Sequence, residues 1–281
     1  MQRAKPLIFA ALLTTAFIST DAWAFPHANI KPKETGSRDY KEGSSAVLSI
    51  GLSHGCTQSG ESFTTRVMTA LFPNGPDPNL HGITYTNNGP TNYEGNAMYG
   101  IKPVVDYNWK QIMPMTGNVP TYYNHGEKTT DVRAIHWHWG YIPDNFVGYA
   151  TFSASFPKFV SDTCYDKIRV EIPVVQYCAL DPKHETDHEW LRDRVKKKNL
   201  DSAYAWIKEP TAMFPTATVV SPGYSAYLNI VRDTTTNPLP SSCGGVGQSV
   251  TVYPTAAEID MYLPPHDGNV PGGGSGGCHM H

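Results

Sequence analysis

Three short histidine-containing segments have residue types and spacings that could bind a metal ion. In the first, IHWHWGYIPDNF, strand alternation places His136 and His138 on one face. Ile135, Trp137 and Trp139 then lie on the other face. Two imidazoles at i and i+2 project in parallel from a stiff strand and can share one metal. The alternative is that the two histidines cover a solvent-facing side while the two tryptophans fill the core.

The second segment reads HETDH, from His184 to His188, and matches the H-E-x-x-H pattern. In that pattern a helix presents two histidines to zinc and the glutamate acts as general base. Thr186 and Asp187 fill positions that are usually apolar on a buried helix of this type, and the next residues are surface-like. We therefore favour an exposed helix, and a zinc-dependent hydrolase using His184, Glu185 and His188 is the alternative.

The third segment collects a thiol, two imidazoles and a thioether in four consecutive residues at the C-terminus. They are Cys278, His279, Met280 and His281. Soft sulfur and nitrogen donors of this kind suit Cu(I), Cu(II) or zinc. The alternative is a terminal segment with no function. A weaker thioether cluster, Met113-Pro114-Met115, is interpreted as packing.

The elements that must position these segments are mainly strands. Charged residues make up 17% of the 281 residues, and 24 Gly, 23 Pro and 16 Tyr favour an all-β fold over a coiled coil or a membrane bundle. We expect a β-sandwich with long irregular loops at residues 74–118. The expected strands cover residues 45–51, 64–72, 132–141, 148–156, 168–177 and 216–231.

Three segments are expected to lie outside this sandwich of residues 25–232. Residues 1–24 have a basic start, a 12-residue apolar run and an Ala-Trp-Ala site, which is the pattern of a cleaved signal peptide. Residues 181–203 are highly charged and are interpreted as a helical insertion. Residues 233–281 are expected to be a Pro/Gly-rich extension ending in a flexible tail.

Charge and hydropathy limit the partners of this chain. A formal net charge of -3 supplies no basic surface for nucleic acid. No later run reaches 18 apolar residues, so we expect no membrane span and a periplasmic or secreted protein. Disulfides are permitted in such a compartment. With five cysteines one is left over, which we take to be Cys278, and three pairings of the other four remain open.

Five short motifs occur in a fixed order between residues 27 and 231. They are HANIKPKE at 27–34, HGC at 54–56 followed by Thr64-Thr65 and Pro73, I-x-W at 135–137 followed by Pro143-Asp144, PVVQYC at 173–178, and AWI at 205–207. In this set and order the chain resembles the YcnI-like copper-binding domain, an exported bacterial β-sandwich family. The resemblance implies a Cu(II) site built on an N-terminal histidine, a carboxylate and a nearby tryptophan.

Carried over to this chain, the resemblance implies that His27 supplies the ring ligand and Trp137 the neighbouring indole. Glu61 is the first choice for the carboxylate and Glu34 the second. Cleavage after residue 24 would leave two residues, the second of them Pro26, ahead of His27, which would then have no α-amine to chelate with.

Without that α-amine, one imidazole and one carboxylate are too few ligands for tight copper binding, and two solutions are open. Either a second trimming step exposes His27, or His136, His138 or the tail completes the ligand set. The resemblance also suggests a disulfide between Cys56 and Cys178, which leaves Cys164 and Cys243 as a second pair.

These observations predict an exported copper-binding protein in copper acquisition, delivery or homeostasis, and not an enzyme. Its cofactor would be Cu(II) at the domain site and Cu(I) at the tail, and its partners the copper ion and another copper-handling protein. The alternatives are the zinc hydrolase and a metal-free extracellular interaction domain.

Overall fold

The computed structural model describes residues 28–31, 36–53, 56–58, 61–75, 85–86, 96–143, 146–179, 203–215 and 225–264, with the backbone alone at 56–58, 61–63, 85–86, 179 and 203. Strands predominate, and the prediction of a β-sandwich is confirmed. In chain order the elements are β1 (Ala28–Ile30), β2 (Asp39–Lys41), β3 (Ser45–Leu52), β4 (Cys56–Gln58), β5 (Glu61–Leu71), β6 (Tyr85–Thr86), β7 (Tyr99–Pro103), β8 (Gln111–Tyr123), β9 (Glu127–Ile142), β10 (Gly148–Ser155), β11 (Lys158–Phe159), β12 (Tyr165–Ile172), β13 (Val174–Ala179), β14 (Ala203–Trp206), β15 (Ala226–Val231), the 3-10 turn η5 (Ser241–Cys243), β16 (Gln248–Val252) and α2 (Ala256–Tyr262).

One layer of the sandwich is the antiparallel sheet β1-β3-β10-β7. Strand β3 alternates between buried and less buried side chains, with Leu48, Ile50 and Leu52 directed inward. A period of two is what a strand with one covered face requires. Its neighbour β10 alternates in the same way and contributes Phe152. The layer therefore presents one apolar face to the rest of the molecule.

The second layer contains two sheets that are linked through one stretch of chain. Strand β12 belongs to the sheet β16-β12-β15-β2, and β13 belongs to the sheet β14-β13-β5-β9-β8. Only Pro173 separates the two strands. The prediction of a single strand over residues 168–177 is wrong at this point, because proline has no N–H to donate to a neighbouring strand.

The main hydrophobic core lies between the two layers. Both sheets of the second layer and the sheet of the first contribute buried side chains to it. Phe72, directly after β5, meets Phe152 of β10 with ring centroids 4.7 Å apart. Trp137 of β9 is fully buried in the same interior. This core accounts for one face of the sheet that contains β5 and β9.

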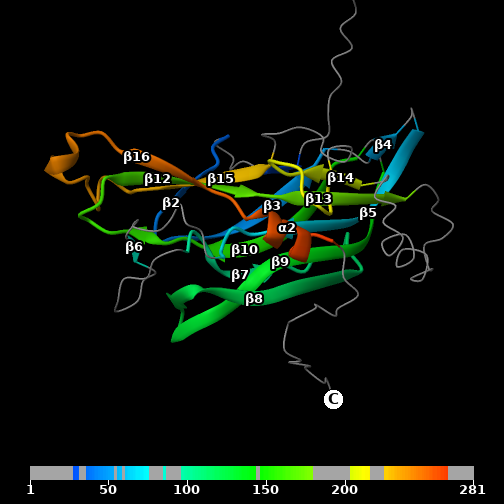
Figure 1. Cartoon of the computed structure of the whole chain (residues 1–281), viewed down its shortest axis with the longest axis horizontal. Helices are drawn as coiled ribbons and strands as arrows, with labels where there is room; N and C mark the ends of the chain where they lie inside the picture. Colours follow the sequence, from blue (N-terminus) through cyan, green and yellow to red (C-terminus); the bar gives the residue numbers. More distant parts are fainter. Residues whose placement is uncertain are drawn as a thin grey trace, which may run out of the picture.

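The other face of that sheet is also covered. Strand β5 is buried at every position from residue 65 to residue 71, which requires apolar neighbours on both sides. A second core cluster occupies this face and includes Phe214, Ile259 and Leu263. These come from the 207–215 segment and from α2 with the residue after it. Figure 1 shows α2 in front of the strands, between β13 and β9.

Helix α2 is short and is held at its N-terminal end. Thr255 and Glu258 form a capping box, in which each side chain bonds the backbone N–H of the other. Glu258 Oε1 also lies 2.5 Å from Nη2 of Arg133, a β9 side chain that is almost fully buried. Burial opposes ionisation of Glu258, but the bonds from Arg133 and Thr255 outweigh it and lower its pKa. The helix is thus pinned to the sheet by an ion pair.

The prediction of irregular loops throughout residues 74–118 is wrong in part. Strand β7 and the 13-residue strand β8 both fall at least partly within this range. Pro114 and Pro120 made β8 difficult to predict, since proline interrupts most strands. Strand β8 is the edge of its sheet, where a residue without an N–H is tolerated.

The chain after residue 232 also differs from the predicted extension. Strand β16 pairs in parallel with β12, and α2 contributes to the second core cluster. Residues 248–263 are therefore part of the folded domain. Among the described residues, no helix is both long and apolar enough to cross a membrane.

Candidate metal site on strand β9

Strand β9 carries His136 and His138 on the sheet face that α2 covers. The ladder with β5 places Thr69 opposite His136 and Val67 opposite His138, and Val67 belongs to the second core cluster. Trp137 points to the opposite face, into the interior between the layers. The two imidazole rings are stacked, with centroids 5.9 Å apart and planes inclined at 27°.

Both imidazoles are buried. His136 has no exposed surface, and 5% of His138 is exposed. The alternative in which the two histidines cover a solvent-facing side is therefore wrong. Alternation predicted a shared face, but it could not predict that a helix more than 100 residues later in the chain would cover it.

The tautomer of His136 follows from one hydrogen bond. Its Nε2 lies 2.6 Å from the backbone carbonyl oxygen of Tyr262, at the end of α2. A carbonyl oxygen can only accept, so Nε2 carries the proton, and in the neutral ring Nδ1 carries the lone pair. Metal-binding histidines commonly donate their second ring N–H to a backbone carbonyl in this way, which fixes the ring and raises the basicity of the other nitrogen.

His138 is held in the neutral form and lacks a partner on one nitrogen. Burial lowers the pKa of His138 to about 4, so the ring is uncharged at neutral pH. Its Nε2 makes no hydrogen bond within the part of the chain that the structure describes. A buried polar atom without a partner costs roughly 1–3 kcal/mol and calls for a physical explanation.

Regular pairing of β9 stops directly after this histidine. Between His138 and Ile142 the strand holds three residues, whereas β5 holds only Arg66 over the same interval. Trp139, the first of the three, has φ of 59°, which is the left-handed region that non-glycine residues seldom adopt. Bulges and such backbone strain concentrate next to functional sites.

The bulge also changes the environment of Trp139. Its side chain is only partly buried, and its indole N–H donates to Oε1 of Gln111 at 3.4 Å. The expectation that Trp139 fills the core together with Trp137 is therefore wrong. Strict alternation cannot survive an insertion of residues into the strand.

The turn after α2 is fixed over the histidine pair by two further hydrogen bonds. The hydroxyl of Thr69 donates to the carbonyl oxygen of Leu263 at 2.7 Å, and the hydroxyl of Tyr177 donates to the same oxygen at 3.0 Å. Together with the His136 to Tyr262 bond, these contacts come from three neighbouring strands. The cover over the pair is thus held by the sheet itself.

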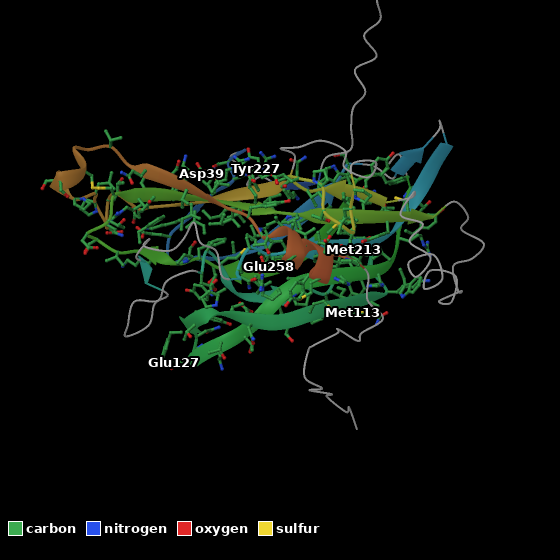
Figure 2. The ribbon with its side chains drawn as sticks, in the orientation of Figure 1. Asp39, Met113, Glu127, Met213, Tyr227 and Glu258 are labelled. Carbon is green, nitrogen blue, oxygen red and sulfur yellow. A yellow bond between two sulfur atoms is a disulfide. The ribbon has the colours of Figure 1, made fainter. Side chains whose placement is uncertain are left out.

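The neighbour of β9 on the side away from β5 is β8, and β8 carries a thioether, that of Met113. The ladder between β8 and β9 places Met113 opposite His136 and Gln111 opposite His138. Met115, two residues further along β8, is buried in the second core cluster. In Figure 2, Met113 is labelled on β8 and Glu258 on α2, which identifies the strand that supplies the thioether and the helix that covers the pair.

The other predicted ligands are not brought together by the described structure. Glu61 begins β5, but its side chain lies outside the described part. His27, Glu34, residues 184–188 and residues 278–281 lie outside it as well. Within the described residues, no group of three or more His, Cys, Asp or Glu could hold a metal. Met113, a thioether, is not one of these four residue types.

Two of the predicted disulfide cysteines form a bond in the structure. Cys164 and Cys243 are joined, and this bond ties the start of β12 to the turn η5. Cys178 is also disulfide-bonded, to a partner outside the described side chains. The pairing of Cys178 with Cys56 stays a prediction.

Comparison of the chain with protein-family models, with curated proteins and with solved structures finds no match. The histidine pair must therefore be interpreted from its own chemistry.

Proposed function

We propose that this chain is an exported copper-binding protein and that His136 and His138 hold a copper ion beneath α2. The observation that carries the proposal is Nε2 of His138, a buried imidazole nitrogen without a hydrogen-bond partner among the described residues. A bound metal ion would give this atom the partner that the described residues do not supply.

The chemistry of the pair favours copper over most other divalent metals. Two neutral imidazoles are good ligands for copper, zinc, iron and nickel, and affinity within that series is greatest for copper. The carbonyl of Tyr262 orients His136 as a ligand histidine is normally oriented. The lowered pKa of His138 keeps protons from competing with a metal ion at neutral pH.

Export is supported by the first 24 residues and by the cysteines. The apolar run and the Ala-Trp-Ala site have the form of a cleaved signal peptide. The bond between Cys164 and Cys243, and the further one at Cys178, suit an oxidising compartment. We therefore assign the protein to the periplasm or the exterior, with a role in copper acquisition, delivery or homeostasis.

This site differs from the one that the YcnI-like resemblance implies. Trp137 faces the interior between the layers, whereas His136 and His138 face α2, so one ion cannot touch both the indole and the pair. The site on His27, with Glu61 or Glu34, stays a prediction for a second copper ion.

The test is copper binding by the mature protein, measured by equilibrium dialysis and elemental analysis. We expect one copper ion at the pair in the wild type and its loss in His138→Leu, which keeps the side-chain volume but has no ligand atom. His125→Asn is the matched control, because His125 is a histidine of the β8–β9 turn with φ of 52°, a conformation that asparagine accepts. It should bind copper as the wild type does.

Three results would overturn the proposal, each in favour of a named alternative. Absence of copper binding in the wild type would favour a metal-free interaction domain. Copper that is retained in full by His138→Leu but lost in His27→Ala would assign binding to the site that the resemblance implies. A zinc-dependent peptidase activity abolished by Glu185→Gln would favour the hydrolase.

A further inference from the structure

Met113 occupies a position from which its thioether can reach both imidazoles. It lies directly opposite His136 in the β8–β9 ladder, so the two side chains are on the same face with Cβ atoms about 5 Å apart. It is also diagonal to His138, at the distance of about 7–8 Å that long side chains can bridge. Methionine has three rotatable bonds and a polarizable sulfur, so its sulfur can adjust to a bound ion.

Two side chains that lie opposite the pair on the neighbouring strands carry oxygen atoms, and both take part in hydrogen bonds. The hydroxyl of Thr69, opposite His136 on β5, donates to the carbonyl of Leu263. The side-chain oxygen of Gln111, opposite His138 on β8, accepts from the indole of Trp139. Both are hard, neutral oxygen atoms, whereas the thioether of Met113 is a soft donor that suits a soft ion.

The charges of the residues next to the two histidines also affect which ion the site prefers. The cross-strand neighbours of the two histidines are Val67, Thr69, Gln111 and Met113, and all four are neutral. The Born cost of burying an ion grows with the square of its charge, so a divalent ion costs about four times as much as a monovalent one. Because these four described neighbours carry no charge, they favour an ion of charge +1 over a divalent one.

From these observations we infer that the site selects Cu(I), held by Nδ1 of His136, Nε2 of His138 and the sulfur of Met113. This inference rests on the proposed function and specifies the oxidation state and the third ligand of that same site. Two imidazoles with one thioether form a soft, neutral, three-donor set, which suits Cu(I). The assignment differs from the sequence-based expectation, which placed Cu(II) at the domain and Cu(I) at the tail.

The test compares Met113→Leu with Met115→Leu in the mature protein. Met115 is the matched control, since it lies on the same strand but opposite Ala134, one step further from His138. Cu(I) affinity is measured by competition with a colorimetric Cu(I) chelator under ascorbate, and Cu(II) affinity by competition in its absence. X-ray absorption at the copper edge reports whether sulfur is bound.

We expect Met113→Leu to weaken Cu(I) binding by more than about tenfold, because even loss of a residue that only supports a ligand costs 10–100-fold. Cu(II) affinity should stay within a factor of about two, and the sulfur signal should disappear from the absorption spectrum. Met115→Leu should bind Cu(I) as the wild type does and retain the sulfur signal. Thermal melts of both variants establish that they are folded.

Two outcomes separate failure of this inference from failure of the proposed function. If copper binds at the pair but Met113→Leu leaves both Cu(I) affinity and the absorption spectrum unchanged, the inference is wrong and the proposed function stands. If the wild type binds copper in neither oxidation state, the proposed function fails and the inference fails with it.

Discussion

Two buried polar clusters of this molecule differ in how completely their hydrogen bonds are satisfied. The first surrounds Glu42, which follows β2 and is 5% exposed. Its carboxylate accepts from the backbone N–H of Phe159 at 2.6 Å and of Asp233 at 2.8 Å, and from the side-chain amide of Asn237. Every oxygen of this buried acid has a donor.

Arg232, the basic member of the first cluster, is equally well satisfied. It is 5% exposed, and its guanidinium donates to the backbone carbonyls of Val160, Thr163 and Tyr165 and to both oxygens of Asn237. The cluster therefore ties the turns around β11 and β12 to the end of β15. It needs no ligand to account for it.

The histidine pair on β9 has the opposite character. His136 is oriented by a backbone carbonyl, but Nε2 of His138, equally buried, has no partner among the described residues. A satisfied buried cluster stabilises the fold, whereas an unsatisfied one lowers stability and is retained for another reason. Both clusters are buried, so the missing partner, and not burial, distinguishes the candidate site from the structural cluster.

The largest effect is expected for Arg232→Met. The substitution leaves several buried carbonyls without a donor, so the free energy of unfolding should fall by about 3–5 kcal/mol. Urea denaturation measures it. The matched control is Arg169→Met, because Arg169 is partly exposed and pairs with Glu171 at 2.8 Å. That change should cost about 1–2 kcal/mol, because it removes this ion pair and the contact of the guanidinium with the ring of Tyr227. Equal losses in the two variants would contradict the structural role of the first cluster.

A somewhat smaller loss in the free energy of unfolding is expected when the metal-free protein is acidified. The pKa of His138 is lowered by burial to about 4, so below the unfolded value near 6.5 the unfolded chain binds more protons than the folded chain. Stability should therefore fall as the pH drops through this window and level off below about pH 4, by roughly 3 kcal/mol in total.

The contribution of His138 to this pH dependence is isolated by difference. Other groups also titrate between pH 7 and pH 4, so the free energy of unfolding is measured in parallel for wild type and His138→Leu. The wild type should lose roughly 3 kcal/mol more than the variant over this range. Parallel curves would show that the buried imidazole does not resist protonation.

The smallest expected effect is a gain in stability, whereas the two larger effects are losses. At pH 7 the metal-free His138→Leu variant should be more stable than the wild type by about 1–2 kcal/mol, since an unsatisfied buried nitrogen is replaced by carbon of similar volume. Thermal and urea denaturation measure the gain. A loss of stability would mean that His138 stabilises the fold. The histidine pair would then be a structural cluster like the one around Glu42 and Arg232.

Much of the strand content could be predicted from the chain. Strands β3 and β10 alternate between buried and less buried side chains, which periodicity predicts. Strands β5 and β9 are buried without a break over residues 65–71 and 133–138, and the Val, Ile and Thr residues of their sequences predicted them. Strand β8 was missed because its prolines resemble loop residues, and only its place at the sheet edge makes them acceptable. Helix α2 had a readable signal, the Thr255-x-x-Glu258 capping box.

The candidate site was predictable only in part. Alternation predicted the shared face of His136 and His138, whereas Met113 was predicted to serve in packing. What periodicity could not give is the register of β8 against β9, which pairs Met113 with His136. It also could not give the cover by Tyr262 and Leu263, because long-range contacts leave no periodic trace in the sequence.

The carbonyl that orients His136 is supplied 126 residues later in the chain, by Tyr262. During synthesis β5, β8 and β9 emerge before that carbonyl exists. The hydrogen bond that orients the ring of His136 therefore cannot form until residue 262 has been made and the final helix docks. A chain that ends before residue 262 lacks that bond, whatever part of the sheet it builds.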